Sequence, residues 1–266
     1  MTRDRTIYAG IDVGSLSTEV VLLDPDGLVA GSSIVATGAS TRKACGEALS
    51  RALSAAGATA ACIACTVSTG YGRESVGGAD RTVTEITCHA RGARHLFPEA
   101  RTVLDIGGQD SKVIRLSPDG KVADFAMNDK CAAGTGRFLE VMARTLEMDL
   151  EDLGPFSLRS RKSLAVSSMC TVFAESEVVS LIASGAAPED IARGIHNAVA
   201  DRVAALAERI GMASPAVMTG GVAKNPGARK ALEERFRLPL LVPAEPQLAG
   251  ALGAALIARE EGLSRH

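Results

Sequence analysis

Aromatic side chains are scarce in this sequence: Phe, Tyr and Trp make up 3% of its 266 residues, and Trp is absent. Neither positive nor negative side chains are in clear excess, because the formal net charge is only −2. Proteins that bind nucleic acid usually present a basic surface to phosphates or aromatic platforms to bases. We therefore expect no nucleic-acid partner.

Long apolar runs are missing as well. No run approaches the roughly 18 residues that a membrane-spanning helix requires, and the start, MTRDRTIYAGIDVG, lacks the apolar core of a signal peptide. Six cysteines are too few for a disulfide scaffold at this length and are better interpreted as reduced thiols, some of them metal ligands. We expect a cytoplasmic protein without membrane contacts.

What the sequence has is an apolar content of 46%, ample for a sizeable core, and a repeated order of elements. Hydrophobic periodicity predicts strands at 7–13, 19–23 and 29–35, a helix at 41–56, a strand at 63–67 and a helix at 83–95. The strand order then restarts at 102–106, 112–116 and 122–127. Helices at 135–147, 171–184 and 188–210 follow, then a strand at 216–219 and helices at 226–234 and 247–260. This weak duplication predicts two similar α/β lobes, and no low-complexity linker separates them.

The two predicted lobes each begin with a strand that ends in an aspartate and a glycine turn. In IDVGSLST, Asp12 precedes Gly14, and hydroxyl side chains follow at Ser15, Ser17 and Thr18. Glycine lets the backbone approach an anion closely, and the hydroxyl groups can donate to it. This turn is a candidate phosphate-binding loop.

The second such turn is LDIGGQDSK, with Asp105 at the strand end and Gly107 and Gly108 after it. Two strand-end carboxylates that face one another across a cleft suit Mg²⁺ bound to a polyphosphate, because hard cations prefer carboxylate oxygens and retained waters. A single turn of this kind is usually only a hairpin. The pair makes Asp12 and Asp105 the candidate catalytic residues.

A third loop, MTGGVAKN, follows the predicted strand at 216–219. Gly220 and Gly221 would allow a flat ligand to approach, and Asn225 lies near the next helix start. This suits an adenosine pocket, although a tight strand-to-helix turn is the alternative. In GALGAAL, residues 250–256, small side chains recur at spacings that let helices cross closely, so we expect packing there.

Two cysteines stand in helix-start patterns: Cys131 in NDKCAAGTGRFLEVMA and Cys170 in SSMCTVFAESEVVSLIA. Neither has a nearby Cys or His partner in the sequence that would complete a mononuclear metal site. An iron–sulfur cluster normally needs four thiolates, so two per chain predict a two-fold symmetric homodimer that shares one cluster.

The loops, in this order, resemble the actin, hexokinase and heat-shock-chaperone ATPase superfamily, in which two ribonuclease-H-like lobes close over ATP. The segments TGYGR, EITCHARGA, LDIGGQDSK, NDKCAAGTGRF, CTVFAESEV and VMTGGVAKN more narrowly resemble activators of 2-hydroxyacyl-CoA dehydratases and the related ATPase subunits of benzoyl-CoA reductase. The resemblance implies lobes at 1–97, completed by 246–266, and at 98–245, with ATP or ADP and Mg²⁺ in the interlobe cleft.

The resemblance also implies that Cys131 and Cys170 hold one [4Fe–4S] cluster between two subunits of an oxygen-sensitive protein. ATP would drive an electron from that cluster to a partner dehydratase or reductase, after reduction by a donor such as ferredoxin or flavodoxin. Gly134, Thr135 and Gly136 would contribute to the nucleotide and cluster loop. By analogy with the water-orienting glutamine of GTPases, Gln109 is a further catalytic candidate.

Alternatives stay open at this point. The same fold serves small-molecule kinases, which would leave Cys131 and Cys170 unexplained, and a zinc-stabilised scaffold is a third interpretation. Cys62 and Cys65 form a CxxC in a buried strand and are interpreted as core residues, as are Cys45 and Cys88. His89 could be a ligand or an acid–base group, but a lone His on a helix is more often a packed or capping side chain. Glu175 and Glu177 could contact a dimer partner, and a solvated helix face explains them equally well.

Overall fold

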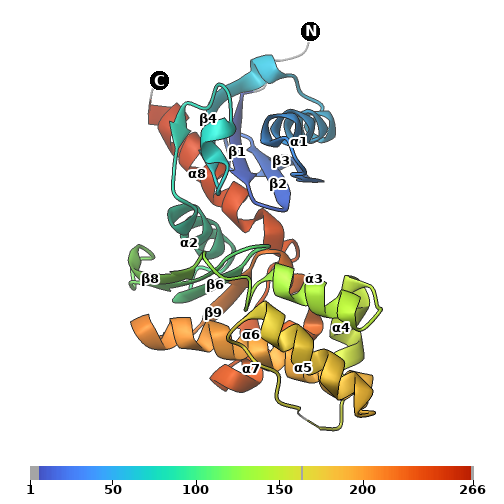
Figure 1. The fold of residues 1–266 in the computed structure, drawn as a ribbon. Coiled ribbons are helices and arrows are strands. Elements are labelled where there is room, and N and C mark those ends of the chain that lie inside the picture. Colours follow the sequence, from blue (N-terminus) through green and yellow to red (C-terminus); the bar gives the residue numbers. More distant parts are fainter. Residues whose placement is uncertain (1–5, 163, 265–266) are drawn as a thin grey trace. The chain divides into compact units, whose positions relative to one another are not determined.

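The computed structural model describes residues 6–162 and 164–264 (Figure 1). The chain forms two compact units. The first comprises the described residues of Met1–Glu99, Pro118–Val122 and Gln247–His266, and the second those of Ala100–Ser117 and Ala123–Pro246. Among the described residues, no helix has both the length and the apolar character needed to cross a membrane.

A five-stranded sheet of order β3-β2-β1-β4-β5 forms the centre of the first unit. The strand β1 pairs antiparallel with β2 and parallel with β4, while β3 extends the antiparallel side and β5 the parallel side. The strands are β1 (Ile7–Val13), β2 (Ser17–Leu23), β3 (Val29–Ala36), β4 (Ile63–Thr69) and β5 (Arg81–Thr82). The short 3-10 helices η1 (Ala60–Cys62) and η2 (Arg73–Ser75) flank β4.

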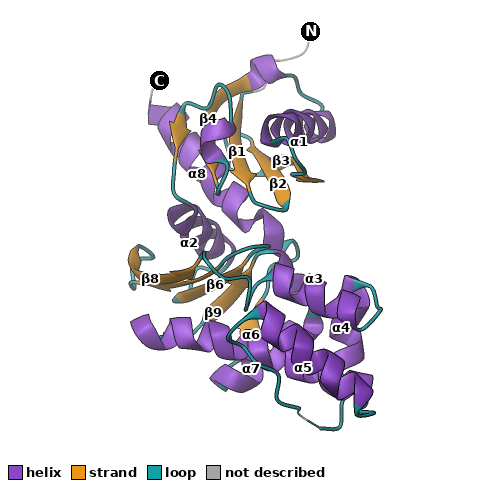
Figure 2. Cartoon of the chain, in the orientation of Figure 1, coloured by secondary structure: helices purple, strands orange, loops and turns teal. Residues whose placement is uncertain are grey.

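Helices cover both faces of this sheet (Figures 1 and 2). The helix α1 (Thr41–Ala56) packs on β2 and β3, whereas α8 (Ala249–Ser264) packs on β1 and β4, and α2 (Glu85–Leu96) packs on α8. Because side chains alternate along a strand, Ile11 joins the core under α1 and Tyr8 joins the core under α8. Both faces of β1 are therefore buried.

Backbone contact between α8 and its neighbours depends on glycines. A Cβ atom on Gly10 of β1 would overlap the carbonyl oxygen of Ala251, and one on Gly92 of α2 would overlap that of Ala249. On α8 itself, a Cβ atom on Gly253 would overlap the carbonyl oxygen of Cys88. The packing predicted for residues 250–256 is confirmed, and it is closest where α8 crosses β1 and α2.

The second unit repeats the strand order of the first. Its sheet, read as β8-β7-β6-β9-β10, has β6 antiparallel to β7 and parallel to β9, which matches β3-β2-β1-β4-β5 strand for strand. The predicted duplication and the two-sheet α/β fold class are confirmed. The strands are β6 (Thr102–Ile106), β7 (Ser111–Leu116), β8 (Val122–Asn128), β9 (Ala216–Thr219) and β10 (Leu240–Leu241).

Helices of the second unit bury one core that includes Leu104, Phe138, Met142, Ile195 and Leu232. They are α3 (Gly136–Thr145), α4 (Leu150–Ser157), α5 (Thr171–Ala183), α6 (Pro188–Ile210) and α7 (Pro226–Phe236), with the 3-10 turn η3 (Gly221–Lys224) before α7. A further 3-10 turn, η4 (Pro246–Leu248), precedes α8.

The helix α4 was not expected from the sequence. Pro155 lies inside it, and an internal proline removes a backbone hydrogen bond and argues against a helix. Leu153, fully buried in the core of the unit, compensates through packing. Tertiary burial here outweighs the local sequence signal.

Candidate functional site

Asp12 and Asp105 occupy equivalent positions in the two sheets. Asp12 is in register with Thr69 on the parallel neighbour β4, and Asp105 is in register with Thr219 on the parallel neighbour β9. Both carboxylates are buried, with 7% and 3% of their residue surfaces exposed. The duplication therefore reproduces the surroundings of the aspartate as well as the strand order.

A glycine follows each of these threonines. Gly70 has φ +88° and Gly220 has φ +84°, a conformation that side chains other than glycine rarely adopt. A Cβ atom on Gly70 would overlap Asp12 Oδ1, and one on Gly220 would lie 2.8 Å from Asp105 Oδ1. Sequence reasoning missed the first of these pairs. Its signal is the Thr-Gly dipeptide, present in both STGYGR and MTGGVAKN.

The Asp105 carboxylate is held by two donors. Lys112 Nζ lies 3.2 Å from Oδ2, and Thr219 Oγ1 lies 3.2 Å from Oδ1. Lys112, only 1% exposed, is also 2.8 Å from Asp110 Oδ2. Burying a charge is costly unless it is paired, and here two carboxylates compensate one buried ammonium. These two donors together fix the orientation of the Asp105 carboxylate.

The loop after Asp105 is bound to the start of α3. The amides of Gly136 and Arg137 donate to the carbonyl oxygens of Gly107 (2.9 Å) and Gly108 (2.8 Å). Thr135 caps the same region, and its Oγ1 donates to the Ala132 carbonyl at 2.7 Å. The structure therefore brings together Gly107, Gly108, Thr135 and Gly136, while Gln109 is exposed in the same loop.

Hydroxyl groups around Gly14 serve partly to shape that turn. Thr18 is buried, and its Oγ1 lies 2.9 Å from Thr37 Oγ1, which itself donates to the Gly14 carbonyl at 2.9 Å. Ser15 and Ser17 are half-buried, and Ser17 accepts from Gln247. Ligand contacts by these residues stay predictions.

In the third loop, Gly220 and Gly221 lead into η3, and Asn225 caps α7 by accepting from the Ala228 amide at 2.9 Å. The helix start predicted beside Asn225 is confirmed, and the adenosine contact stays a prediction. Buried His196 packs next to this cap: a Cβ atom on Gly227 would lie 2.9 Å from its Cε1 atom. Burial lowers the pKa of His196 to about 4, so its imidazole is neutral.

Cys131 does not lie at a helix start, and that expectation is wrong. The helix α3 begins at Gly136, because a turn with Gly134 at φ +86° interrupts the chain first. Asn128 fixes this turn, since its Nδ2 donates to the carbonyl oxygens of Cys131 (2.8 Å) and Ala133 (3.1 Å). The Asn of NDKCAAGTG was the available sequence signal.

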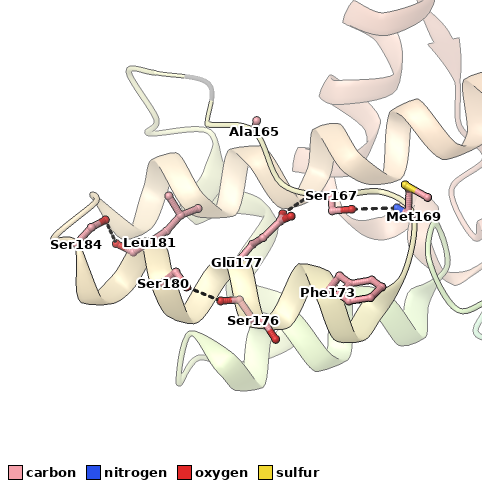
Figure 3. A pocket seen from close by; sticks show the side chains of 9 residues that line it. All are labelled: Ala165, Ser167, Met169, Phe173, Ser176, Glu177, Ser180, Leu181 and Ser184. Atoms are coloured by element: carbon pink, nitrogen blue, oxygen red, sulfur yellow. Dashed lines mark hydrogen bonds between the residues drawn. The ribbon is translucent and has the colours of Figure 1, made fainter.

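Cys170 is the N-cap of α5, so its predicted helix-start position is confirmed. The Cys131 thiol lies 3.9 Å from the carbonyl oxygen of Met169. Glu177, on the first turns of α5, accepts from the Ser167 amide at 2.6 Å and so holds the stretch that leads to Cys170 (Figure 3). Glu177 is thus a supporting residue within the chain, a role that neither of its two sequence interpretations, a dimer contact or a solvated helix face, predicted.

The two thiols have no third metal-ligating partner among the described residues, where no group of three His, Cys, Asp or Glu side chains could hold a metal ion. Cys131 and Cys170 are half-buried. Of the others, Cys62 lies in η1 rather than in a strand, and Cys65 is buried in β4. Burial raises the pKa of Cys88 to about 12.

An apolar face of α5 is exposed beside Cys170. Only Ala174 and Val178 of this helix are buried, whereas Met169, before it, is 78% exposed and Phe173 is 66% exposed. A groove of about 770 Å³ runs between α5 and the preceding segment (Figure 3). Its lining residues are Ala165, Ser167, Met169, Phe173, Ser176, Glu177, Ser180, Leu181 and Ser184.

A protein-family model matches residues 9–258, nearly the whole chain. The chain belongs to the BadF/BadG/BcrA/BcrD ATPase family. It is 47% identical to the "(R)-2-hydroxyglutaryl-CoA dehydratase activating ATPase" of Acidaminococcus fermentans over 95% of this chain and 97% of that protein. It is 36% identical to a benzoyl-CoA reductase subunit of Thauera aromatica, over 98% and 96% of the two chains.

Among solved structures, the activator of the 2-hydroxyisocaproyl-CoA dehydratase from Clostridium difficile with bound ADPNP superposes with a TM-score of 0.93 at 43% identity, covering 98% of this chain and 97% of that one. A ROK family glucokinase from Streptomyces griseus, with 13% identity and a TM-score of 0.58 over 96% and 99%, shares the fold alone. These comparisons confirm the expected family and activity class: this member of the BadF/BadG/BcrA/BcrD family is an ATPase.

Proposed function

We propose that the chain is the activating ATPase of a 2-hydroxyacyl-CoA dehydratase, in which two copies share one [4Fe–4S] cluster through Cys131 and Cys170 of each. The observation that carries this proposal is the placement of the Cys131 thiol against Met169, directly before Cys170, with no third ligand among the described residues. Two thiols from each of two copies give the four that such a cluster normally requires. When bound, the cluster supplies a one-electron carrier.

The surroundings of Cys131 and Cys170 favour the binding of an anionic group. Cys170 caps α5, whose N-terminus leaves backbone N–H groups free and carries partial positive charge. The Cys131 loop is held by Asn128, and the Cys170 segment is held by Glu177. Both thiols are therefore positioned by bonds that need no metal.

A second copy is the occupant that fits the apolar face of α5. Phe173, Val172 and Met169 are each at least 66% exposed next to Cys170. Surface of this kind usually marks an interaction site, and a two-fold axis through it would bring the four thiols together.

Nucleotide binding is assigned to the loops that the duplication repeats. Asp12 and Asp105 would hold Mg²⁺ or the water that attacks the terminal phosphate, while the amides near Gly14, Gly107 and Gly108 would approach phosphate oxygens. The loop at Gly107 is bonded to Gly136, five residues after Cys131. A hydrogen bond followed by a short stretch of backbone thus connects the proposed nucleotide loop to a proposed cluster ligand.

Two neighbouring functions compete with this one. A benzoyl-CoA reductase-type ATPase subunit is the nearer alternative, and the dehydratase activator is favoured by 47% identity against 36%. A small-molecule kinase of the same fold would leave the paired placement of Cys131 and Cys170 without a role. Ferredoxin or flavodoxin remains the proposed electron donor.

Anaerobic purification tests the proposal. We expect a brown dimer with about four iron and four sulfide per two chains. Cys131→Ser and Cys170→Ser should each abolish the cluster, while Cys62→Ala and Cys65→Ala should retain it. A colourless protein that still hydrolyses ATP under strict anoxia, or zinc in place of iron, would reject the proposal.

A further inference from the structure

The Asp12 carboxylate lies between two glycines. A Cβ atom on Gly70 would overlap Oδ1, and a Cβ atom on Gly250, in the first turn of α8, would overlap Oδ2. Gly70 also has φ +88°, which glycine adopts readily. The carboxylate is thereby confined to one orientation, with each oxygen facing a different element.

His89, on α2, is the side chain that approaches the oxygen on the α8 side. Its Nε2 atom lies 3.6 Å from Asp12 Oδ2, and both residues are buried, with 6% and 7% of their surfaces exposed. A Cβ atom on Gly250 would lie 2.8 Å from the same Nε2 atom. Gly250 is therefore what leaves room for this pair.

The surroundings of Asp105 indicate what His89 does. There Lys112, in register with Asp105 on the antiparallel strand, donates to Oδ2. At the corresponding register position beside Asp12 stands Glu19, a carboxylate. The antiparallel strand thus places a cation beside Asp105 but none beside Asp12. His89 on α2 instead approaches Oδ2 of Asp12, which corresponds to the Asp105 oxygen that Lys112 contacts.

We propose that His89 is a positioning residue for Asp12, equivalent in role to Lys112 beside Asp105, and that it orients the Asp12 carboxylate toward Mg²⁺–nucleotide. This inference rests on the proposed function of Asp12. The separation of 3.6 Å exceeds a hydrogen bond, and contacts of this kind often lengthen without ligand and tighten when it binds. Partners that orient a metal-ligating carboxylate commonly change metal affinity or activity by about 10- to 100-fold when removed.

Two substitutions at His89 separate donor function from packing. In His89→Leu the donor is lost and the volume is roughly kept, so we expect affinity for Mg²⁺–ADPNP, measured by calorimetry, to fall about tenfold or more. Binding of ADPNP without Mg²⁺ should be unchanged. His89→Gln restores an N–H near the position of Nε2 and should recover affinity to within about threefold of the parent. His95→Leu, an exposed histidine on the same helix, is the matched control and should bind normally.

A substitution on α8 tests the same pair from the opposite side. Gly250→Ala inserts a methyl group between Asp12 and His89 and should weaken Mg²⁺–ADPNP binding at least as much as His89→Leu. Gly262→Ala is its control, because there a Cβ atom would crowd Tyr8 at the far end of α8. It should lower the melting temperature without changing nucleotide affinity.

Failure of the inference is distinguishable from failure of the proposed function. If Asp12→Asn weakens Mg²⁺–ADPNP binding while folded His89→Leu binds like the parent, His89 is only a packing residue. Equal losses in His89→Leu and His89→Gln would also overturn the positioning role. If Asp12→Asn itself binds normally, the assignment of Asp12 to the nucleotide site is wrong.

Discussion

The Cys131 thiol lies 3.9 Å from the carbonyl oxygen of Met169, the residue before Cys170. Two cysteines that are 39 positions apart in the sequence are thus brought to one region by a loop and a helix cap. The bonds from Asn128 and Glu177 fix the two backbone segments independently of each other. Insertion of the proposed cluster would therefore require little rearrangement within one chain.

Thiol labelling should separate the cysteines into three groups. In cluster-free protein, the half-buried Cys62, Cys131 and Cys170 should react with iodoacetamide, while Cys88 should not, because burial raises the pKa of Cys88 to about 12 and blocks access. In cluster-loaded protein, Cys131 and Cys170 should become protected and Cys62 should still react. Peptide mass spectrometry measures both patterns, and labelling of Cys131 in the loaded protein would contradict the ligand assignment.

Substitutions at Asp105 and Lys112 should separate catalysis from stability. Asp105→Asn should lower ATP turnover by about 100-fold or more, because a charge aimed at the reacting centre is lost. Lys112 would keep its partner Asp110. Lys112→Met leaves buried Asp105 and half-buried Asp110 without their shared cation and should cost about 3 kcal/mol or more in unfolding free energy. Steady-state kinetics and urea denaturation give the two quantities, and unchanged turnover in folded Asp105→Asn would exclude a catalytic role.

His196 should make the protein sensitive to mild acid. Burial lowers its pKa from the usual 6.5 to about 4, so the unfolded chain takes up a proton before the folded chain does. The stabilising contribution is complete above pH 6.5 and declines as the pH falls toward 4, by about 3 kcal/mol in total. In His196→Gln that part of the pH dependence should disappear, whereas His95→Gln should retain it. Denaturation midpoints between pH 4 and 7 provide the comparison.

Gly220 should tolerate no side chain. Gly220→Ala combines a φ of +84° with overlap at the Ile106 carbonyl, so we expect a loss of about 3 kcal/mol in stability and weaker nucleotide binding. Gly78→Ala is the matched control, since its φ is +81° and no atom lies within 4 Å of the position that its Cβ would take. It should cost only about 1 kcal/mol. Equal losses in the two variants would mean that backbone strain alone matters at Gly220.

Phe173 should contribute to dimer formation. Phe173→Glu places a charge on the apolar face of α5, and desolvating that charge in an interface is costly, so the variant should elute as a monomer and fail to retain iron. Leu28→Glu changes a residue of similar exposure in the first unit, 67% against 66%, and should remain dimeric. Light scattering decides between the two outcomes, and a dimeric Phe173→Glu would place the interface elsewhere.

Much of the fold could be predicted from local pattern. The strand Ile7–Val13 and the helices Thr41–Ala56 and Pro188–Ile210 begin and end where periodicity and capping residues predict. The predictions failed where tertiary contact decides. The helix α4 contains Pro155 and depends on buried Leu153, and the turn at Gly134 separates Cys131 from α3.

The site was partly predictable for the same reason. The loops at Asp12 and Asp105 have local signatures, as do Cys131 and Cys170. The proximity of His89 to Asp12 has none, because it depends on where α2 and α8 pack against β1, and only their glycines hint at that approach.

The position of α8 has a consequence for biosynthesis. This helix completes the first unit but is encoded after the whole second unit, so a growing polypeptide leaves the ribosome with β1 covered on one side only. The second unit has all of its strands by then and can fold beforehand. Gly250 can reach Asp12 only after every residue of the second unit has been synthesised, so the surroundings of Asp12 are completed later than those of Asp105.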